Sequence, residues 1–161
     1  MIVILNYGVG NLGSIRNMLK RTGVNTIISS KSADIRAADG LILPGVGAFD
    51  NGMLCIKKYI APLVKKVFEE QTPILGICLG MQMLTNKSEE GQLPGLGWIN
   101  AETVRFNAPN TSIKIPHMGW NTVKIKRKDS IFKDMLVDPR FYFVHSYHVI
   151  CNNDNNTLST T

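Results

Sequence analysis

The sequence predicts an α/β fold, in which an open and mostly parallel sheet is flanked by helices. In the first half, short apolar segments alternate with amphipathic ones, which is typical of βα units. Glycine-rich turns follow several of the apolar segments, as expected where strands turn into helices. The second half is richer in alternating, aromatic and β-branched residues, which predicts antiparallel additions. A length of 161 residues suits a single domain over 1–161.

The elements of the first half follow from these patterns. A strand at 2–5 and a helix at 14–21, ended by Gly23, precede a strand at 24–28. The stretch GLILPGVG, 40–47, reads as a short apolar strand that runs into a turn. A long helix over about 51–70, interrupted near Pro62, is expected next. A strand at 74–77 and a helix at 79–84 complete this half.

The second half predicts strands in three stretches and one short helix. The stretches are LGWINAETVRF at 96–106, NTVKIK at 121–126 and FYFVHSYHVI at 141–150, and this half is expected to hold antiparallel additions plus one more buried strand. The helix is expected around 130–136. The sequence shows no internal repeat or linker before the asparagine-rich NNDNN at 152–156.

Bulk properties exclude several classes of protein. The first residues, MIVILNYGVG, have no basic leader and too short an apolar run for a signal peptide or membrane span. Three widely spaced cysteines argue against a disulfide framework or a zinc site, so we expect no metal and a reducing cytoplasm. The net charge of +6 is concentrated partly in KIKRKDSIFK, 124–133. Without an aromatic stacking platform, this segment is expected to be a solvated edge and not a nucleic-acid site, although a face for an acidic partner or phosphorylated substrate is the alternative.

The first glycine-rich turn has two interpretations. Gly8, Gly10 and Gly13 match G-x-G-x-x-G between a strand and a helix, which is the dinucleotide-binding pattern. The pattern also needs an acidic residue after the second strand, and IISSKS, 27–32, offers none. Ser29, Ser30 and Lys31 could suit a 2′-phosphate, so NADP binding stays an alternative to a turn that simply needs glycine.

The second glycine-rich turn predicts a nucleophile. In GICLG, 76–80, Cys78 lies between two glycines at a strand-to-helix turn, the form of a nucleophile elbow. The turn directs the N–H of Leu79 and the start of the following helix toward the thiol, which favours thiolate and stabilises an oxyanion. Cys55 lies in a helical apolar stripe and is expected to be a core residue. Cys151 follows a strand and has no such geometry.

A second oxyanion donor is expected from LPGVGAF, 43–49. This loop also follows a parallel strand, so it should open on the same edge of the sheet as the elbow. The N–H groups of Gly45 and Val46 are the candidates.

Taken together, these segments identify a resemblance. The stretches NYGVGNL, LPGVGAFD, GICLGMQML, SEEG with GLGWI, IPHMGWN and YFVHSY resemble, in order, those of the class I glutamine amidotransferases. PHMGWN with VHSY narrows the resemblance to the branch of glutaminase subunits of imidazole glycerol phosphate synthase, a histidine-pathway enzyme. The resemblance implies a flavodoxin-like fold and no cofactor.

The resemblance also implies roles for particular residues. Cys78 would attack the side-chain amide of glutamine, forming a thioester and releasing ammonia. Gln82 and Glu90 match positions that line the glutamine pocket, where a carboxylate can meet the α-ammonium of the substrate. Glu90 could equally be a solvated loop residue.

A partner subunit follows from the same resemblance. Asn11, Met118 and Trp120 match the face that docks on a (β/α)₈-barrel synthase subunit in a heterodimer. Docking makes chemical sense because ammonia released into water is protonated and loses its nucleophilicity. The first glycine-rich turn then needs no dinucleotide.

The activating base is the missing part of the pattern. Family members use a histidine followed two residues later by a glutamate near the C-terminus, and no segment of this sequence matches it. His117 and His145 match segments whose histidines are not the base, while His148 is a weak alternative. We therefore expect a C-terminally truncated amidotransferase that is inactive as it stands.

Three other functions stay open at this point. The chain could be a related amidotransferase subunit for sugar amidation in surface-polysaccharide synthesis, or a non-catalytic binding subunit that keeps the docking face. An NADP-binding module is the third.

Overall fold

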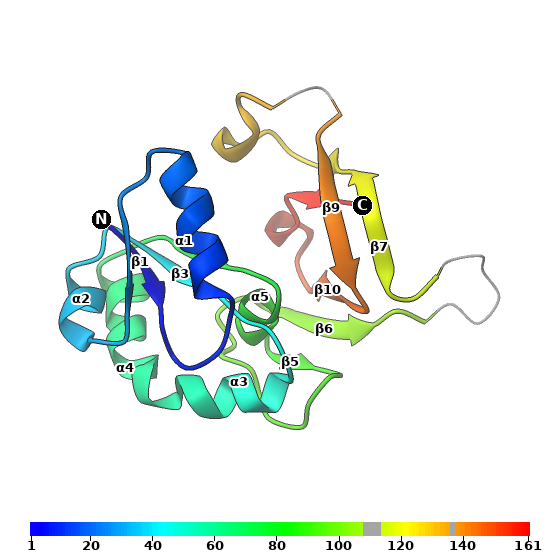
Figure 1. Cartoon of the computed structure of the whole chain (residues 1–161). Coiled ribbons are helices and arrows are strands. Elements are labelled where there is room, and N and C mark those ends of the chain that lie inside the picture. Colours follow the sequence, from blue (N-terminus) through cyan, green and yellow to red (C-terminus); the bar gives the residue numbers. More distant parts are fainter. Residues whose placement is uncertain (108–113, 136–137) are drawn as a thin grey trace.

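The computed structural model describes residues 1–107, 114–135 and 138–161 and confirms the α/β fold. A parallel sheet in the order β2-β1-β3-β4 makes up the first half (Figure 1). Its strands are β1 Ile2–Leu5, β2 Thr26–Ser29, β3 Gly40–Leu43 and β4 Ile74–Gly76. The α-helices of this half are α1 Leu12–Arg21, α2 Ser32–Arg36, α3 Phe49–Ile56, α4 Ile60–Val64 and α5 Leu79–Met83.

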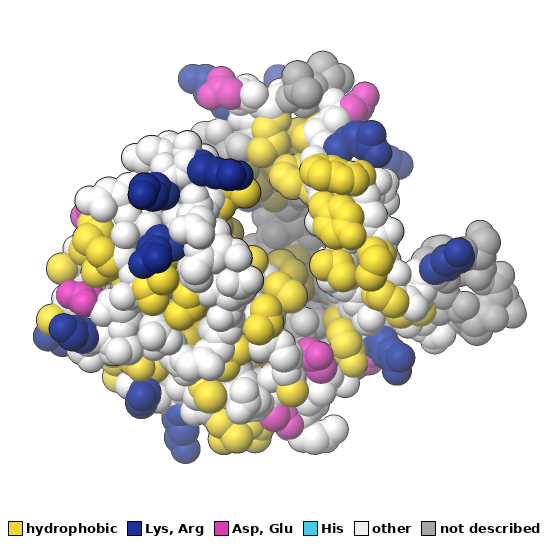
Figure 2. All heavy atoms as spheres, in the orientation of Figure 1, with side chains coloured by type: hydrophobic (Ala, Val, Ile, Leu, Met, Phe, Trp, Pro, Cys, Tyr) yellow, Lys and Arg dark blue, Asp and Glu magenta, His cyan; other side chains and the backbone are white. Residues whose placement is uncertain are grey.

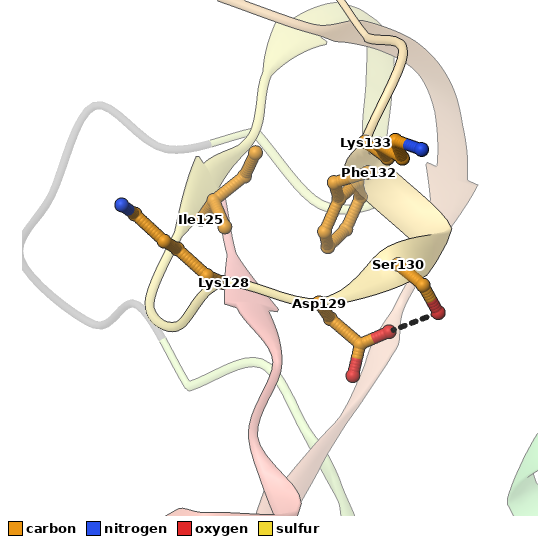
Figure 3. A pocket seen from close by; sticks show the side chains of 6 residues that line it. All are labelled: Ile125, Lys128, Asp129, Ser130, Phe132 and Lys133. Carbon is orange, nitrogen blue, oxygen red and sulfur yellow. Dashed lines mark hydrogen bonds between the residues drawn. The ribbon is translucent and has the colours of Figure 1, made fainter.

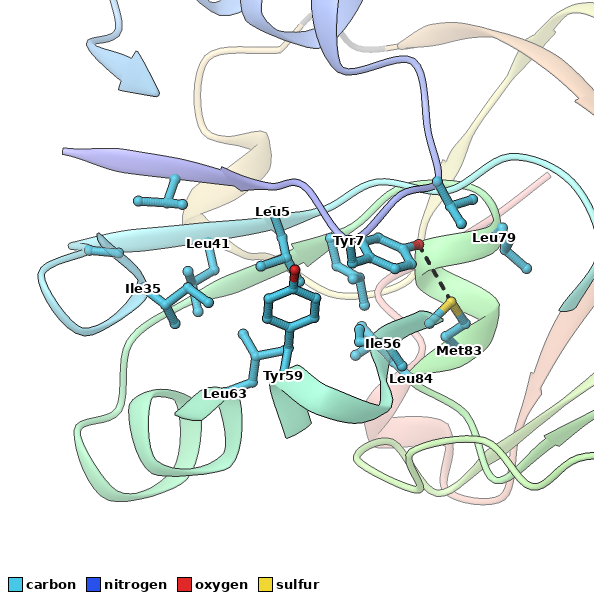
Figure 4. Packing of buried hydrophobic residues seen from close by; sticks show 14 of the residues in the cluster. Leu5, Tyr7, Ile35, Leu41, Ile56, Tyr59, Leu63, Leu79, Met83 and Leu84 are labelled. Carbon is cyan, nitrogen blue, oxygen red and sulfur yellow. Dashed lines mark hydrogen bonds between the residues drawn. The ribbon is translucent and has the colours of Figure 1, made fainter. Parts of the chain in front are cut away.

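The core lies between this sheet and the helices α2 to α5. The central strands β1 and β3 are almost continuously apolar because a parallel sheet is covered on both faces. Phe49 and Ile56 of α3 and Leu79 and Met83 of α5 are fully buried against them. Figure 4 shows how the side chains of β1, α3 and α5 converge beneath the carboxyl ends of the strands. The helix that follows the elbow is therefore packed into the core.

The second half adds three small sheets with antiparallel pairing, as predicted. β10 Tyr147–Cys151 pairs antiparallel with β6 Ala101–Arg105, which also pairs parallel with β5 Lys87–Ser88. β7 His117–Thr122 pairs antiparallel with β9 Arg140–His145 in a two-stranded ribbon. β8 Lys124–Ile125 pairs with β11 Ser159–Thr160. The short 3₁₀ helices η3 Ser130–Phe132 and η4 Asp154–Asn156 lie in the connections.

Two boundaries near the N-terminus differ from the sequence prediction. Helix α1 begins at Leu12 and not at residue 14, because the side chain of Asn11 accepts a hydrogen bond from the Ser14 N–H and caps it. The helix ends as expected before Gly23, whose φ of +76° is easy only for glycine. Helix α2 was not predicted, since its five residues are too few for a helical period to stand out.

The long helix is broken earlier than predicted. A 3₁₀ turn, η1 Lys57–Tyr59, separates α3 from α4, and a π-helical turn, η2 Lys65–Glu69, follows. Pro62 lies inside α4, in its first turn, where a missing N–H costs little. Because proline has no N–H to donate to the carbonyl four residues back, the break falls in the turn before it.

The segment 141–150 is not one buried strand. It is divided at Ser146 into β9 and β10, which belong to different sheets. Tyr142 and Val144 of β9 are exposed. The predicted strand at 121–126 is likewise divided between β7 and β8. The predicted helix at 130–136 is only the 3₁₀ turn η3, and residue 136 lies outside the described residues.

The basic segment does not form a convergent site. Lys128 and Lys133 point in opposite directions around a surface hollow, while Ile125 and Phe132 face its middle (Figure 3). Lys124, Lys126 and Arg127 are exposed. This arrangement fits a solvated edge. Among the described residues, no helix is long and apolar enough to cross a membrane, and no cluster of His, Cys, Asp and Glu could hold a metal ion.

Candidate active site

Cys78 occupies a strained turn between β4 and α5. Its φ of +54° and ψ of −116° are unusual for a residue with a side chain, and strain of this kind is concentrated at functional sites. The flanking glycines allow the turn to pack closely. A Cβ on Gly80 would lie 1.9 Å from the Leu43 carbonyl oxygen, and one on Gly76 would lie 2.7 Å from the Cα of Met81. Cys78 itself is exposed, as a nucleophile must be.

Cys78 opens into a pocket of about 400 Å³. The pocket lies at the carboxyl edge of the parallel sheet, where the loops after β3 and β4 meet the corner between β9 and β10. Open α/β sheets bind ligands at this edge. The lining residues are Gly47, Cys78, Leu79, Gln82, Glu90, Pro116, Val144, His145, Ser146 and Tyr147.

Gln82 and Glu90, both predicted for the site, are brought together by a residue that the sequence did not reveal. The hydroxyl of buried Ser88 donates to Oε1 of Gln82 at 3.2 Å and accepts the backbone N–H of Glu90 at 3.2 Å. Ser88 thus holds Gln82 of α5 and the loop residue Glu90 next to each other. A serine two positions before a glutamate in SEEG was the only signal in the sequence.

Glu90 carries an unsatisfied buried atom. Its Oε2 has no hydrogen-bond partner among the described residues. Burial raises the pKa of the Glu90 carboxyl above its usual value, and the neighbouring Gln82 side chain opposes the rise. A half-buried carboxylate in a pocket is stabilised by a cation placed against it, so this end of the pocket suits an ammonium group.

The loop that carries Glu90 is held by Asp50 at the start of α3. The Asp50 carboxylate accepts the backbone N–H groups of Gln92 at 2.9 Å and Leu93 at 3.0 Å. A Cβ on Gly91 would lie 2.2 Å from the same carboxylate. Asp50 was also missed, because a first-turn aspartate in a helix looks like an ordinary capping residue.

The candidate oxyanion donors lie beside one another. Leu79 is the first residue of α5, and an N–H at this position has no acceptor within its helix. Gly45 packs on the elbow so closely that a Cβ there would lie 2.7 Å from the Gly80 nitrogen. The N–H groups of Gly45 and Val46 donate no hydrogen bond to another described backbone group. Neither residue is among those that line the pocket, to which this loop contributes Gly47.

His145 lines the pocket, but its imidazole is already engaged. Its Nδ1 donates to the Tyr147 carbonyl at 2.7 Å, and its Nε2 lies 2.8 Å from Nδ1 of His117. The amide of Asn121 fixes the tautomers. Its oxygen accepts the Thr122 N–H, so its nitrogen donates to Nε2 of His117, which leaves Nδ1 of His117 to donate to His145. With both nitrogens occupied, His145 has no lone pair for the Cys78 proton.

His148 does not line the pocket. It stacks on Phe106 with ring centroids 4.6 Å apart, and its Nδ1 is buried without a partner among the described residues. Burial, followed by the proximity of His145, lowers the pKa of His148, while Glu89 opposes this. A neutral imidazole in this place is poorly positioned to activate Cys78, which weakens the alternative that His148 is the base.

The predicted docking residues are distributed over two elements. Met118 and Trp120 are 61% and 65% exposed, as expected for a partner face. They pair across the β7–β9 ribbon with Val144 and Tyr142, which share their face and are also exposed. Figure 2 shows hydrophobic side chains gathered in a column over this ribbon. Asn11 is exposed, but its side-chain oxygen is used to cap α1.

Other predicted residues lie away from the pocket. Ser29 is buried, and its hydroxyl interacts with the Asp34 carboxylate and accepts the Lys31 N–H. A carboxylate at this place would repel a 2′-phosphate, so the NADP interpretation loses its support. Cys55 packs against the core but is only half-buried, and Cys151 is half-buried too.

The fold and the elbow cysteine together define a class of protein. The family model described as glutamine amidotransferase class-I matches residues 3–161, and the chain belongs to this family. Two solved structures titled as glutamine amidotransferases share the fold. One has a TM-score of 0.70 at 18% identity, covering 100% of this chain and 80% of that chain. The other, from Thermotoga maritima, has a TM-score of 0.61 at 17% identity, covering 93% and 62%.

Curated relatives are more specific. The imidazole glycerol phosphate synthase subunit HisH 2 of Methanococcus maripaludis is 54% identical, covering 100% of this chain and 80% of the relative. The Pseudomonas aeruginosa protein of the same name is 46% identical over 98% of this chain and 79% of the relative. The HisH subunit of Bdellovibrio bacteriovorus is 41% identical over 99% and 80%.

Proposed function

We propose that this chain is the glutaminase subunit of an imidazole glycerol phosphate synthase, working in histidine biosynthesis in the cytoplasm. The observation that carries the proposal is the shared pocket of Cys78, Gln82 and Glu90. Cys78 stands in the pocket on a strained elbow. The carboxylate oxygen of Glu90, which has no partner among the residues that the structure describes, supplies the negative charge that an amino acid's α-ammonium needs.

The reaction follows from this placement. The Cys78 thiolate attacks the side-chain carbonyl carbon of glutamine, and the carbonyl electrons move to oxygen. The N–H groups of Leu79 and of the Gly45–Val46 segment stabilise the oxyanion. When the carbonyl re-forms, the C–N bond breaks, the nitrogen takes up the proton that the Cys78 thiol lost, and ammonia leaves. Water then attacks the thioester and releases glutamate, returning the thiol.

Ammonia leaves near the proposed docking face. Val144 lines the pocket and also belongs to the exposed face of the β7–β9 ribbon, so the two sites are contiguous. A (β/α)₈-barrel synthase subunit that covers this face would receive ammonia before water protonates it. The exposed apolar residues of the ribbon support a protein partner.

The general base is not one of the described histidines in this proposal. Both nitrogens of His145 are hydrogen-bonded, and His148 does not line the pocket. Loss of a triad member costs several orders of magnitude in rate. The 161-residue chain by itself is therefore expected to hydrolyse glutamine negligibly, even with a synthase partner.

Ammonia release is the test. We would compare the 161-residue chain with a version extended through a His-x-Glu segment, each with its barrel partner, and with Cys78→Ala and Cys55→Ala in the extended version. The expected result is turnover only by the extended protein, abolished by Cys78→Ala and kept by Cys55→Ala. Equal turnover by both lengths would place the base within residues 1–161, and turnover that survives Cys78→Ala would refute the proposal.

A further inference from the structure

The first glycine-rich turn, 6–11, packs against the loop that is proposed to hold the oxyanion. Tyr7 of this turn is 4% exposed, and its hydroxyl donates to the carbonyl oxygen of Pro44. Gly10 approaches the same residue from another direction, since a Cβ there would lie 3.0 Å from the Cβ of Pro44. Pro44 is therefore held on two sides by one turn.

The hydrogen bond fixes the direction of a peptide plane. The Pro44–Gly45 peptide is trans, so its C=O and N–H groups point in opposite directions and cannot turn independently. When Tyr7 holds the carbonyl in the core, the whole plane is held. The next peptide, Gly45–Val46, is joined to it only through the dihedral angles of a glycine, which are intrinsically free.

The Tyr7 hydroxyl donates mainly to one acceptor, the Pro44 carbonyl. Figure 4 shows the hydroxyl directed at the Met83 sulfur, 3.6 Å away. A thioether sulfur is a weak acceptor, so the Pro44 carbonyl is the main partner of the hydroxyl. Burial, with a smaller effect of Cys55, raises the pKa of Tyr7 beyond its usual range, so the O–H keeps its proton at any physiological pH. Met83 belongs to α5, the helix that follows Cys78. Tyr7 thus contacts both the loop after β3 and the helix that follows Cys78.

We infer that Tyr7 is a positioning residue for glutamine hydrolysis, whose hydroxyl holds the Pro44 carbonyl and thereby the Gly45 N–H that is proposed to stabilise the oxyanion. This inference rests on the proposed function of Cys78. It gives the glycine-rich turn a role in catalysis that needs no nucleotide.

The test compares two reagents on Cys78 in the full 161-residue chain at pH ~9, where a thiol is largely ionised. A chloroketone analogue of glutamine is attacked at its ketone carbon, which puts a negative charge on oxygen before sulfur displaces chloride. Iodoacetamide reacts in one displacement of iodide, with no oxyanion. The ratio of the two rate constants, read by mass spectrometry of the Cys78 peptide, therefore reports the oxyanion site.

The matched variants are Tyr7→Phe and Tyr59→Phe. Tyr59 is 5% exposed in the same core, and its hydroxyl donates to the carbonyl of Asn6 at 3.3 Å, in the same turn, and not to Pro44. We expect Tyr7→Phe to slow the chloroketone by about tenfold, less than the ~100-fold or more for a deleted oxyanion donor, with no change for iodoacetamide. Tyr59→Phe should change neither rate.

A second measurement on the same proteins follows the loop directly. Hydrogen exchange of the amides at 45–47 should quicken in Tyr7→Phe and not in Tyr59→Phe. Equal chloroketone rates in Tyr7→Phe and the unmodified chain, or an equal loss in both variants, would overturn the inference and leave the proposed function standing. If the unmodified chain is not labelled at Cys78 by the glutamine analogue, the proposed function itself fails.

Discussion

At the scale of single residues, the site is built from groups that are individually unfavourable. Cys78 adopts a left-handed backbone conformation, and Glu90 has a buried carboxylate oxygen without a partner in the described parts of the chain. Neither feature stabilises the fold. Ser88 and Asp50 offset part of the cost by fixing the loop around Glu90 through hydrogen bonds. A site kept at the expense of stability is typical of enzymes.

The cost of the site in folding stability can be measured at Glu90. Because its pKa is raised in the folded state, the carboxylate costs no stability below the unfolded value near 4.5, and it destabilises the fold progressively as the pH rises through and above that value. Glu90→Gln should therefore melt at a higher temperature than the unmodified chain at pH 7, and at the same temperature near pH 4.

Although Glu90→Gln should be the more stable protein at pH 7, it should bind glutamine less tightly. An α-ammonium against Glu90 makes a charged hydrogen bond worth about 1.5–3 kcal/mol, so Glu90→Gln should bind glutamine at least about tenfold more weakly by calorimetry. The control is Glu69→Gln, an exposed residue on η2, which should change neither quantity. A variant that lowers stability at pH 7, or that keeps full glutamine affinity, would contradict this role of Glu90.

At the scale of elements, the contact between β3 and α5 sets the elbow. Gly80 of α5 lies against the Leu43 carbonyl at the end of β3, where there is no room for a side chain. The close approach places the loops after β3 and β4 together. This explains why the loop at 43–49 and the elbow at 76–80 lie at one site, as expected for the ends of neighbouring parallel strands.

Two glycine-to-alanine changes separate packing from helix propensity. Gly80→Ala places a Cβ 1.9 Å from a backbone oxygen, so it should destabilise the fold by about 3 kcal/mol or more. Gly13→Ala in α1 meets nothing within 4 Å and should stabilise by up to about 1 kcal/mol. Urea unfolding curves of both variants check this, and similar effects in the two would show that the close contact does not govern stability.

At the scale of the whole molecule, the β7–β9 ribbon stands apart from the parallel sheet (Figure 1). It turns an apolar face to solvent. Met118, Trp120, Tyr142 and Val144 are each more than half exposed. The opposite face of the ribbon carries His117 and His145, whose hydrogen bonds reach the pocket corner at Tyr147. Val144 on one face and His145 on the other both line the pocket, so the pocket lies at the end of the ribbon and adjoins the proposed partner face.

Trp120→Ser tests the partner face. Because Trp120 is 65% exposed, its loss should leave the melting temperature of the isolated chain nearly unchanged. It should weaken binding to a barrel synthase subunit about 30-fold, the effect of a ~2 kcal/mol hot spot, in a titration followed by calorimetry. Ile131→Ser, at a residue 62% exposed on η3, is the matched control and should bind normally. Normal binding by Trp120→Ser would show that this face of the ribbon is not part of the interface.

Local sequence determined the parallel sheet, the elbow at Cys78 and the loop at Gly45. Apolar runs of strand length, ended by glycine, are short-range signals that need no knowledge of the rest of the chain. The family resemblance added the expectation for Gln82 and Glu90 by matching motifs. It is the sequence, too, that placed Met118 and Trp120 on a common segment, PHMGWN.

Only the tertiary structure decided which side chains meet. Ser88 contacts Gln82, six positions away, and Tyr7 contacts Pro44, 37 positions away. Asp50 contacts two loop residues that are 42 and 43 positions away. The local sequence does not predict these partners. The split of 141–150 at Ser146 and the engagement of both His145 nitrogens likewise depend on which strands pair. Strand pairing is a long-range choice, made by the burial of whole faces and not by the residues at the break.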